Sequence, residues 1–241
     1  MPLKAPLPDH LEWLTEKVEQ LIRPAAFLCP DKSRAPARGA TQAWGPPDLP
    51  ADAPWAQGMR PDMWQQSWHD GPVFALQLEL AGIPAEARKP IWPAQGVVWV
   101  FFDASDPEAG WKAWAEFDPR PASDIPWQPR AQTAYPVKAS TWALADTLTC
   151  ATDESLPEIA WDYHGGVGMG VDYDEWWQKH YGCRLPSTIQ VGGWIHPIQG
   201  GYAPDGSTLV CAMERLEFGD NGAIYLHHCP AKGFSVSVHT H

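Results

Sequence analysis

The sequence predicts an α+β protein that is predominantly β, with antiparallel sheets formed by two pseudo-repeated halves, an N-terminal helix and long loops rich in proline and tryptophan. Short segments with strand-type patterns recur along the chain between Gly, Pro, Asn and Asp residues. Helical spacing is limited to two segments, 9–23 and 173–181. Proline supplies 26 of the 241 residues and tryptophan 15, so we expect long loops that are held in place by aromatic packing.

The charge and hydropathy of the chain narrow the classes of function. The 29 acidic and 17 basic residues give a net charge of −12, which disfavours a nucleic-acid-binding protein because such proteins need clustered Lys and Arg. The longest fully apolar run is 97–102, far shorter than a membrane span, and the N-terminus has no signal-peptide pattern. We therefore predict an acidic cytoplasmic protein that binds neither nucleic acid nor membrane.

The first helix is expected over residues 9–23. Leu11, Leu14 and Val18 follow one another at helical spacing. Asp9 is expected to cap the helix together with Glu12, and Pro24 to end it. Residues 30–72 and 104–134 are expected to form long irregular loops because Pro, Gly and Asp are frequent in them.

The strands are predicted from two patterns. Residues 73–80 alternate between apolar and other side chains, which predicts a half-buried strand, whereas 97–103 is a continuous apolar run typical of a central strand covered on both faces. Asn221-Gly222 is expected to be the tip of a two-residue hairpin turn, with Gly222 at positive φ. Further strands are predicted at 137–149, 208–218, 223–228 and 234–238, the last of them at an edge.

Two parts of the chain share an order of elements. Each part has a Gly/Pro segment, an amphipathic strand that ends near a carboxylate, a glycine and an apolar strand. This repetition predicts two related β-rich halves in a single domain. The expected division is 1–38 for the N-terminal helix and linker, 39–134 for the first half and 135–241 for the second half.

The residues of this repeated pattern resemble the YwqG-like family of bacterial domains of unknown function. The first-half motifs of that family are similar to residues 45–50, Trp55, 74–78 and 96–102, and the second-half motifs to 192–199, 210–214 and 218–226. The match departs from the family pattern at Trp44, Ala56, Met213 and Phe218. The resemblance implies an α+β fold with internal pseudo-symmetry, and it implies no established reaction.

Related domains occur among the immunity proteins of bacterial toxin systems. The resemblance therefore implies, by analogy, a non-enzymatic protein-binding module, with an immunity protein against a basic toxin as one form of it. The alternative interpretation is an uncharacterised enzyme or metal-binding protein. We predict no cofactor, and the sequence contains none of the common catalytic motifs such as HExxH, GxSxG or a Walker loop.

Two residue sets carry the alternative interpretation. If Cys211 opposes His227 and Cys229 across a hairpin, the three side chains provide a metal-binding set, although buried thiols and surface histidines also explain them. Carboxylates at strand ends and turns would serve acid–base chemistry if they converged, and solvated side chains are the other explanation. These carboxylates are Glu79, Asp103, Glu214 and Asp220.

The strongest charge pattern lies in the second half. Residues 139–178 contain eight acids and no Lys or Arg, interleaved with six Trp and Tyr residues. Acidic side chains around aromatic anchors suit a basic protein partner, whereas the other explanation is that the acids are solvated and the aromatics fill the core. The predicted partner-binding residues are Asp153, Glu154, Glu158, Trp161, Trp176 and Trp177.

Overall fold

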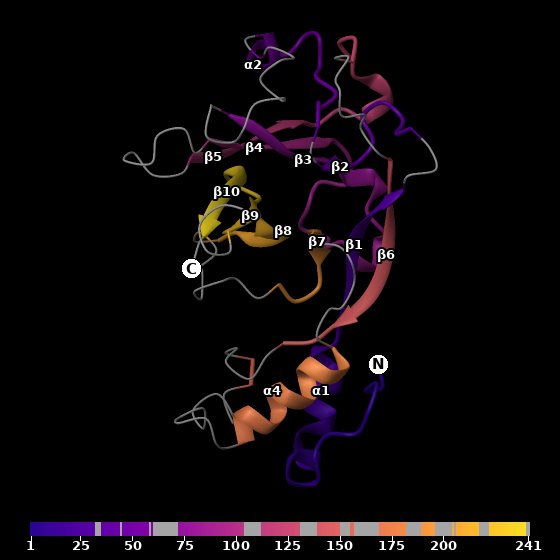
Figure 1. The fold of residues 1–241 in the computed structure, drawn as a ribbon, viewed down its shortest axis with the longest axis vertical. Coiled ribbons are helices and arrows are strands. Elements are labelled where there is room, and N and C mark those ends of the chain that lie inside the picture. Colours follow the sequence, from indigo (N-terminus) through magenta and orange to yellow (C-terminus); the bar gives the residue numbers. More distant parts are fainter. Residues whose placement is uncertain are drawn as a thin grey trace.

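The protein consists of two antiparallel β-sheets and a separate layer of helices (Figure 1). The computed structural model describes residues 1–31, 35–43, 45–57, 59, 72–103, 112–130, 139–149, 155–156, 169–181, 189–195, 204, 206–216 and 222–239. Ten strands and a few helices in these residues confirm the predicted α+β, predominantly β fold.

The two sheets differ in size and in strand order. The four-stranded sheet has the order β2-β3-β4-β5, and the six-stranded sheet has the order β10-β9-β8-β7-β1-β6. The four-stranded sheet contains β2 (Gln42–Ala43), β3 (Val73–Glu79), β4 (Val97–Asp103) and β5 (Lys112–Asp118). The six-stranded sheet contains β1 (Arg23–Asp31), β6 (Ala139–Thr147), β7 (Ile189–Gly192), β8 (Thr208–Leu216), β9 (Gly222–Cys229) and β10 (Gly233–His239).

Each sheet contains a meander of four consecutive strands, β2 to β5 in one and β7 to β10 in the other. Both meanders begin with a short strand that carries a glutamine, Gln42 or Gln190. Each glutamine donates its side-chain amide to carbonyls of the segment that follows, Pro46 in the first meander and Trp194 in the second. The two meanders thus share these features, and the division into two related halves stays a prediction.

The two sheets pack face to face around the main apolar core. Leu76, Leu78, Val98 and Val100 of the four-stranded sheet share one cluster with residues of the six-stranded sheet. Those residues include Val191, Met213, Ile224 and Leu226. Burial of these aliphatic side chains, at about 25 cal/mol per Å² of apolar surface, holds the sheets together.

The outer face of the four-stranded sheet is covered as well. Trp99 of β4 lies 5.1 Å from Trp55, measured between ring centroids, and 6.1 Å from Trp127. Trp55 belongs to the short helix α2 (Pro54–Gln57), and Trp127 follows the 3-10 helix η5 (Ala122–Asp124). Every residue of β4 except its last is therefore buried, which confirms the prediction of a central strand covered on both faces.

Three helices form a layer beside the start of β1 and the end of β6, away from the four-stranded sheet (Figure 1). The layer contains the 3-10 helix η1 (Asp9–Leu14), α1 (Thr15–Leu21) and α4 (Met169–His180). It has an apolar cluster of its own, which includes Leu11, Leu14, Val18, Leu148, Tyr173 and Trp176. Among the described residues, no helix has both the length and the apolar character needed to cross a membrane.

The start of the chain differs from the prediction in three ways. The Asp9 side chain does not cap the first helix, because Pro8 takes the cap position and no side-chain hydrogen bond forms there. The helix ends before Ile22, whose backbone is extended, and not at Pro24. Much of the expected linker in 1–38 is strand β1, which pairs with β6 on one side and β7 on the other.

The other strand predictions are mostly confirmed, with three omissions and one error. Strands β2, β5 and β7 lie in segments for which no strand was expected. The expected half-buried strand is buried on both faces, since Ala75 and Gln77 are as inaccessible as their apolar neighbours. The second helix is present and begins earlier than expected, at Met169.

The turn predicted at Asn221-Gly222 is wrong for Gly222. This glycine belongs to β9 and is the register partner of Leu216, so the connection between β8 and β9 spans 217–221. Asn221 lies outside the described residues. A two-residue turn would need Gly222 at its tip, where it could not pair with Leu216.

We predict that Gly192→Ala destabilises the protein by more than about 2 kcal/mol, whereas Gly233→Ala costs about 1 kcal/mol. Both glycines have positive φ, at +68° and +81°. A Cβ atom on Gly192 would lie 2.1 Å from the Ala87 carbonyl oxygen, while a Cβ on Gly233 meets nothing within 4 Å. Urea unfolding of the two variants measures both costs, and equal losses would contradict the close packing at Gly192.

Candidate functional site

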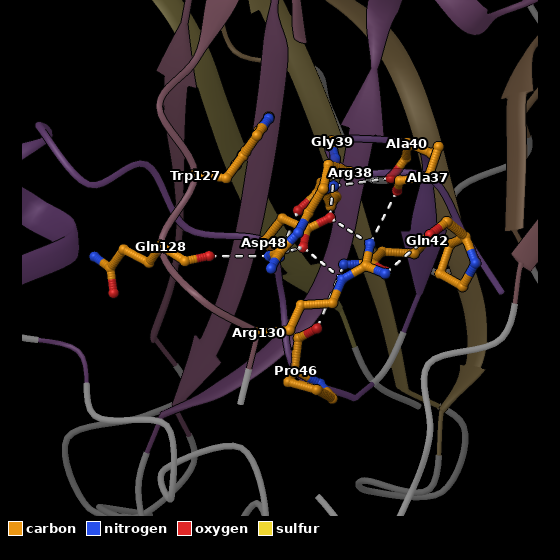
Figure 2. Close-up of polar contacts among 12 residues, drawn as sticks. Ala37, Arg38, Gly39, Ala40, Gln42, Pro46, Asp48, Trp127, Gln128 and Arg130 are labelled. Atoms are coloured by element: carbon orange, nitrogen blue, oxygen red, sulfur yellow. Dashed lines mark hydrogen bonds and ion pairs between the residues drawn. The ribbon is translucent and has the colours of Figure 1, made fainter. Parts of the chain in front are cut away.

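The Asp48 carboxylate, in the segment between β2 and β3, is buried and accepts four hydrogen bonds (Figure 2). Asp48 follows Gly45, at φ +91°, and two prolines, which direct the chain across the sheet face. Its side chain is fully buried. Arg130 donates Nε to Oδ1 and Nη2 to Oδ2, both at 2.7 Å, and Arg38 and the Gly39 amide complete the site at 2.9 Å each.

The backbone of Asp48 is held as firmly as its side chain. Its amide donates to the Gln77 Oε1 at 3.0 Å, and its carbonyl accepts from the Trp99 indole at 2.8 Å. The same indole also donates to Gln77 Oε1 at 3.1 Å. Gln77 is buried in β3 and donates its own amide to the Ala40 carbonyl. The segment around Asp48 is therefore fixed to the middle of the sheet.

The electrostatics of this site favour the ionised carboxyl. Burial by itself disfavours the charged form of Asp48, but the hydrogen bonds and charges of Arg130, Gly39 and Arg38 outweigh that cost and hold the pKa of Asp48 below its ordinary value. Arg130 and Arg38 also donate to backbone carbonyls of Pro36 and Gln128. Because each carboxylate oxygen already accepts two hydrogen bonds, the site fixes two loops to the sheet and has no free acceptor for a substrate.

We predict that Asp48→Asn lowers the free energy of unfolding by about 3–5 kcal/mol, because it leaves two arginines at a buried site without their carboxylate. Asp52→Asn is the matched control. Asp52 also accepts two hydrogen bonds from one arginine, Arg120, but its side chain is 48% exposed. We expect the control to leave the unfolding midpoint nearly unchanged in urea, since exposed ion pairs contribute little. Similar midpoints for the two variants would contradict the stabilising role of the Asp48 ion cluster.

The structure describes two of the six predicted partner-binding residues. Trp176 is 7% exposed, packs against Tyr173 and Tyr181, and donates its indole N–H to the Pro6 carbonyl at 2.7 Å. It belongs to the core of the helical layer, so the packing explanation holds for this residue. Trp177 is half-buried and donates to the Leu148 carbonyl. The others, Asp153, Glu154, Glu158 and Trp161, lie outside the described residues.

The exposed aromatic of the helical layer is a residue that sequence reasoning missed. Trp13 is 59% exposed, and its indole N–H donates to the His10 carbonyl. The His10 side chain in turn contacts Asp172 of α4 at 2.9 Å, which joins the two helices at the surface. The helical spacing in the sequence could have predicted this exposure, because Trp13 lies outside the apolar stripe of Leu11, Leu14 and Val18.

Acidic side chains surround Trp13. Residues 9–21 contain four acids and one lysine, and the exposed acids among them are Asp9, Glu12 and Glu16. Asp172 extends the group onto α4. We call the set Asp9, His10, Glu12, Trp13, Glu16 and Asp172 the acidic helical surface.

A groove of about 480 Å³ adjoins the acidic helical surface. One wall is the extended N-terminal segment 2–7, and the other is formed by Asp9, Glu12 and Glu19. Glu19 accepts a hydrogen bond from the Leu3 amide, which holds the segment against the helix. Lys4 also lines the groove and places its ammonium over the Tyr181 ring. Three carboxylates to one ammonium give the groove a negative field.

The predicted metal-binding set is not assembled. Cys211 is the register partner of Leu226, and both side chains lie in the core between the sheets, whereas His227 contacts Ser237 on the opposite face of the sheet. A register irregularity between Leu209 and Cys211 helps to place Cys211 there, so it cannot face His227 or Cys229. Among the described residues, no three His, Cys, Asp or Glu side chains gather as metal ligands.

The described cysteines are free thiols. Cys29, Cys211 and Cys229 form no disulfide, and burial raises the pKa of the Cys211 thiol well above its ordinary range. A thiol in this state reacts slowly because the thiolate is the nucleophile. Cys150 and Cys183 lie outside the described residues.

His227 is a buried histidine that the fold keeps neutral. It is 3% exposed, its Nε2 lies 2.8 Å from the Ser237 hydroxyl, and its Nδ1 has no hydrogen-bond partner among the described residues. Burial, and secondarily the charge of His239, lower the pKa of His227 to about 4. The unfolded chain therefore binds a proton at this residue between about pH 6.5 and pH 4 that the folded protein does not bind.

We predict that this difference destabilises the protein as the pH falls. A lowered folded-state pKa gives stability that is complete above pH 6.5 and is lost towards pH 4, by up to about 3 kcal/mol. His227→Gln removes the titrating group, so we expect its free energy of unfolding to depend less steeply on pH in this window. Parallel pH profiles for the variant and the wild type would show that His227 is not responsible.

The strand-end carboxylates do not converge. Glu79 pairs with Val97 at one end of β4, and Asp103 lies at the other end, six residues or about 20 Å away. Glu214 belongs to β8 of the other sheet, and Asp220 lies outside the described residues. Glu79 and Asp103 therefore do not form the acid–base pair considered from the sequence.

No model of a protein family matches the chain, and no curated protein matches it. The resemblance to the YwqG-like family remains a prediction from the sequence motifs.

Proposed function

We propose that this protein is a non-enzymatic binding module that captures a basic protein on its acidic helical surface. The observation that carries the proposal is the exposure of Trp13, at 59%, among carboxylates that have few neighbouring cations. A large exposed aromatic leaves apolar area in water that a partner can bury. Tryptophan is also among the residues most enriched in the energetic centres of protein interfaces.

The charges and the aromatic ring have different roles in this proposal. The carboxylates of Asp9, Glu12 and Glu16 raise the rate of encounter with a cationic protein over distances of about a Debye length, 8 Å at physiological salt. Once the partner has docked, burial of the Trp13 ring slows its dissociation, because exposed rim charges contribute little affinity of their own.

The groove beside the helix supplies a site for a partner side chain. A lysine or arginine that entered between the segment 2–7 and α1 would meet the carboxylates of Asp9 and Glu12. The apolar stem of such a side chain could lie along Pro6 and Leu7, which line the same groove. The groove therefore favours a basic partner over an acidic one, whose carboxylates would be repelled there.

The partner class that we propose is a basic toxin, for which this chain acts as an immunity protein. The support is the acidic helical surface together with the resemblance to the YwqG-like family, whose relatives include such proteins. Asp153, Glu154, Glu158 and Trp161 are proposed as a further part of the contact, on the basis of their sequence pattern alone. On this proposal no cofactor is needed.

We predict that Trp13→Ala raises the dissociation rate of the partner by at least tenfold, as expected for a residue at an interface centre. Ile91→Ala is the control, since Ile91 is another exposed large apolar side chain, at 44%, outside the helical layer. The partner is captured from the native host by a photo-crosslinking residue at position 13 or, as a control, at position 91, and surface plasmon resonance then measures the rates. Equal rates for the two alanine variants would contradict the role of Trp13.

Charge reversal tests the electrostatic part separately. Glu16→Lys should slow association at low salt and lose this effect at high salt, whereas Asp124→Lys, an exposed acid beside the four-stranded sheet, should not. The combined reversal of Asp153, Glu154 and Glu158 tests their proposed contribution in the same way. A captured partner that is acidic, or an association rate that ignores salt, would end the proposal.

A further inference from the structure

Three elements from distant parts of the chain meet at the boundary between the six-stranded sheet and the helical layer. Arg23 begins β1, Gly193 follows β7, and Arg88 and Lys89 follow the 3-10 helix η4 (Ala85–Ala87). Ala25 of β1 is the register partner of Gly192 of β7. All three elements line one small pocket.

Two glycines allow this close approach. A Cβ atom on Gly192 would lie 2.1 Å from the Ala87 carbonyl oxygen, and one on Gly193 would lie 2.3 Å from Thr147 Oγ1. Both residues have positive φ, near +67°, which other residues rarely adopt. Because η4 packs directly on Gly192, Arg88 and Lys89 line the same pocket as Gly193 and Trp194. The positions of the two cations therefore follow from the backbone.

The pocket gathers three cationic side chains that have no carboxylate partner. Arg23 donates to the Ile22 and Gln20 carbonyls and Arg88 to the Ala94 carbonyl, which leaves their charges uncompensated. No carboxylate among the described residues forms an ion pair with Arg23, Arg88 or Lys89. Partial burial and the neighbouring Arg23 charge lower the pKa of Lys89, the direction expected where like charges are held together.

This arrangement contrasts with the other arginine cluster of the protein. Arg38 and Arg130 approach each other around Asp48, which the chain itself supplies as their counter-ion. In the pocket at Gly193 the one acidic lining residue is Glu86, which is exposed and forms no ion pair with the three cations among the described residues. Arg23 and Lys89 are exposed to solvent and Arg88 is half-buried, so an anion from solution can reach all three cations.

We propose that this pocket is a binding site for a phosphate dianion, which supplies the missing counter-charge to Arg23, Arg88 and Lys89. Guanidinium groups bind phosphate through paired N–H···O bonds, and lysine adds a compact charge. The volume of about 180 Å³ suits a small group, since sites for larger ligands start at about 300 Å³. Trp194 also lines the pocket, so the organic part of a phosphomonoester would meet an aromatic residue there.

Calorimetric titration with inorganic phosphate and with phenyl phosphate, at constant ionic strength set with chloride, tests the site. We expect saturable binding that Lys89→Gln and Arg88→Gln each weaken about tenfold, which corresponds to one charge-assisted hydrogen bond. Lys232→Gln is the control, because Lys232 is exposed in the turn between β9 and β10 and the variant changes the net charge equally. Tighter binding of phenyl phosphate would identify a phosphomonoester as the ligand, and equal binding would identify free phosphate.

A second measurement guards against variants that simply unfold. Phosphate should raise the unfolding temperature of the wild type and of Lys232→Gln at constant ionic strength, and should raise that of Lys89→Gln much less. The absence of saturable binding to the wild type would overturn the proposal. So would an equal loss of binding in Lys232→Gln, because it would show that phosphate responds to the general charge of the protein and not to this pocket.

Discussion

The buried ion cluster at Asp48 is the interaction on which the first half of the structure depends. A carboxylate without solvent is costly unless charged groups and hydrogen bonds surround it, and Asp48 meets this condition only when Arg38, Arg130 and Gly39 are all in place. Arg38 comes from the segment before β2 and Arg130 from the segment after η5, so the cluster closes only when both ends of this half lie over the sheet. Trp99 and Gln77 then hold the backbone of Asp48 against β3 and β4. The cluster therefore makes the folding of the proline-rich loops and the sheet of this half cooperative.

The second half has the same meander of strands, but the segment after its first strand is held on the sheet by different contacts. Gln190 holds the segment after β7 as Gln42 holds the segment after β2, and Tyr225 lies at the third-strand position that Trp99 occupies in the first half. At the start of that segment, however, Gly192 and Gly193 stand where the first half has Trp44 and Gly45, no pair of prolines follows them, and η4 packs directly on the backbone. Cations then gather where the protein provides no carboxylate. A repeated framework has therefore produced one closed ion cluster and one open pocket.

A strand could be predicted from the sequence where its own residues have a strong pattern. It could not be predicted where its position depends on pairing with neighbouring strands. Strand β4 could be predicted because six consecutive β-formers leave no other interpretation, whereas β1 contains Pro24 and Pro30, and its place is fixed by β6 and β7. The prediction of a metal-binding set was wrong for a similar reason. The irregularity in β8 that places Cys211 in the core between the sheets has no local signal in the sequence. Trp176 and Trp13 show that composition does not separate core from surface. Their positions on the helices separate the two residues, because Trp176 packs inward and Trp13 lies outside the apolar stripe.

The distribution of the arginines explains why the helical surface remains acidic. Arg23, Arg38, Arg88, Arg120 and Arg130, whose side chains the structure describes, all donate to carbonyls or carboxylates of the protein itself. They lie on the sheets or at the boundary with the helical layer, where they fix loops. The helical layer therefore has few cations to neutralise Asp9, Glu12 and Glu16. A chain with 17 bases that uses its arginines internally must present its excess of acids elsewhere, and the surface around Trp13 is where the described residues present them together with an exposed aromatic ring.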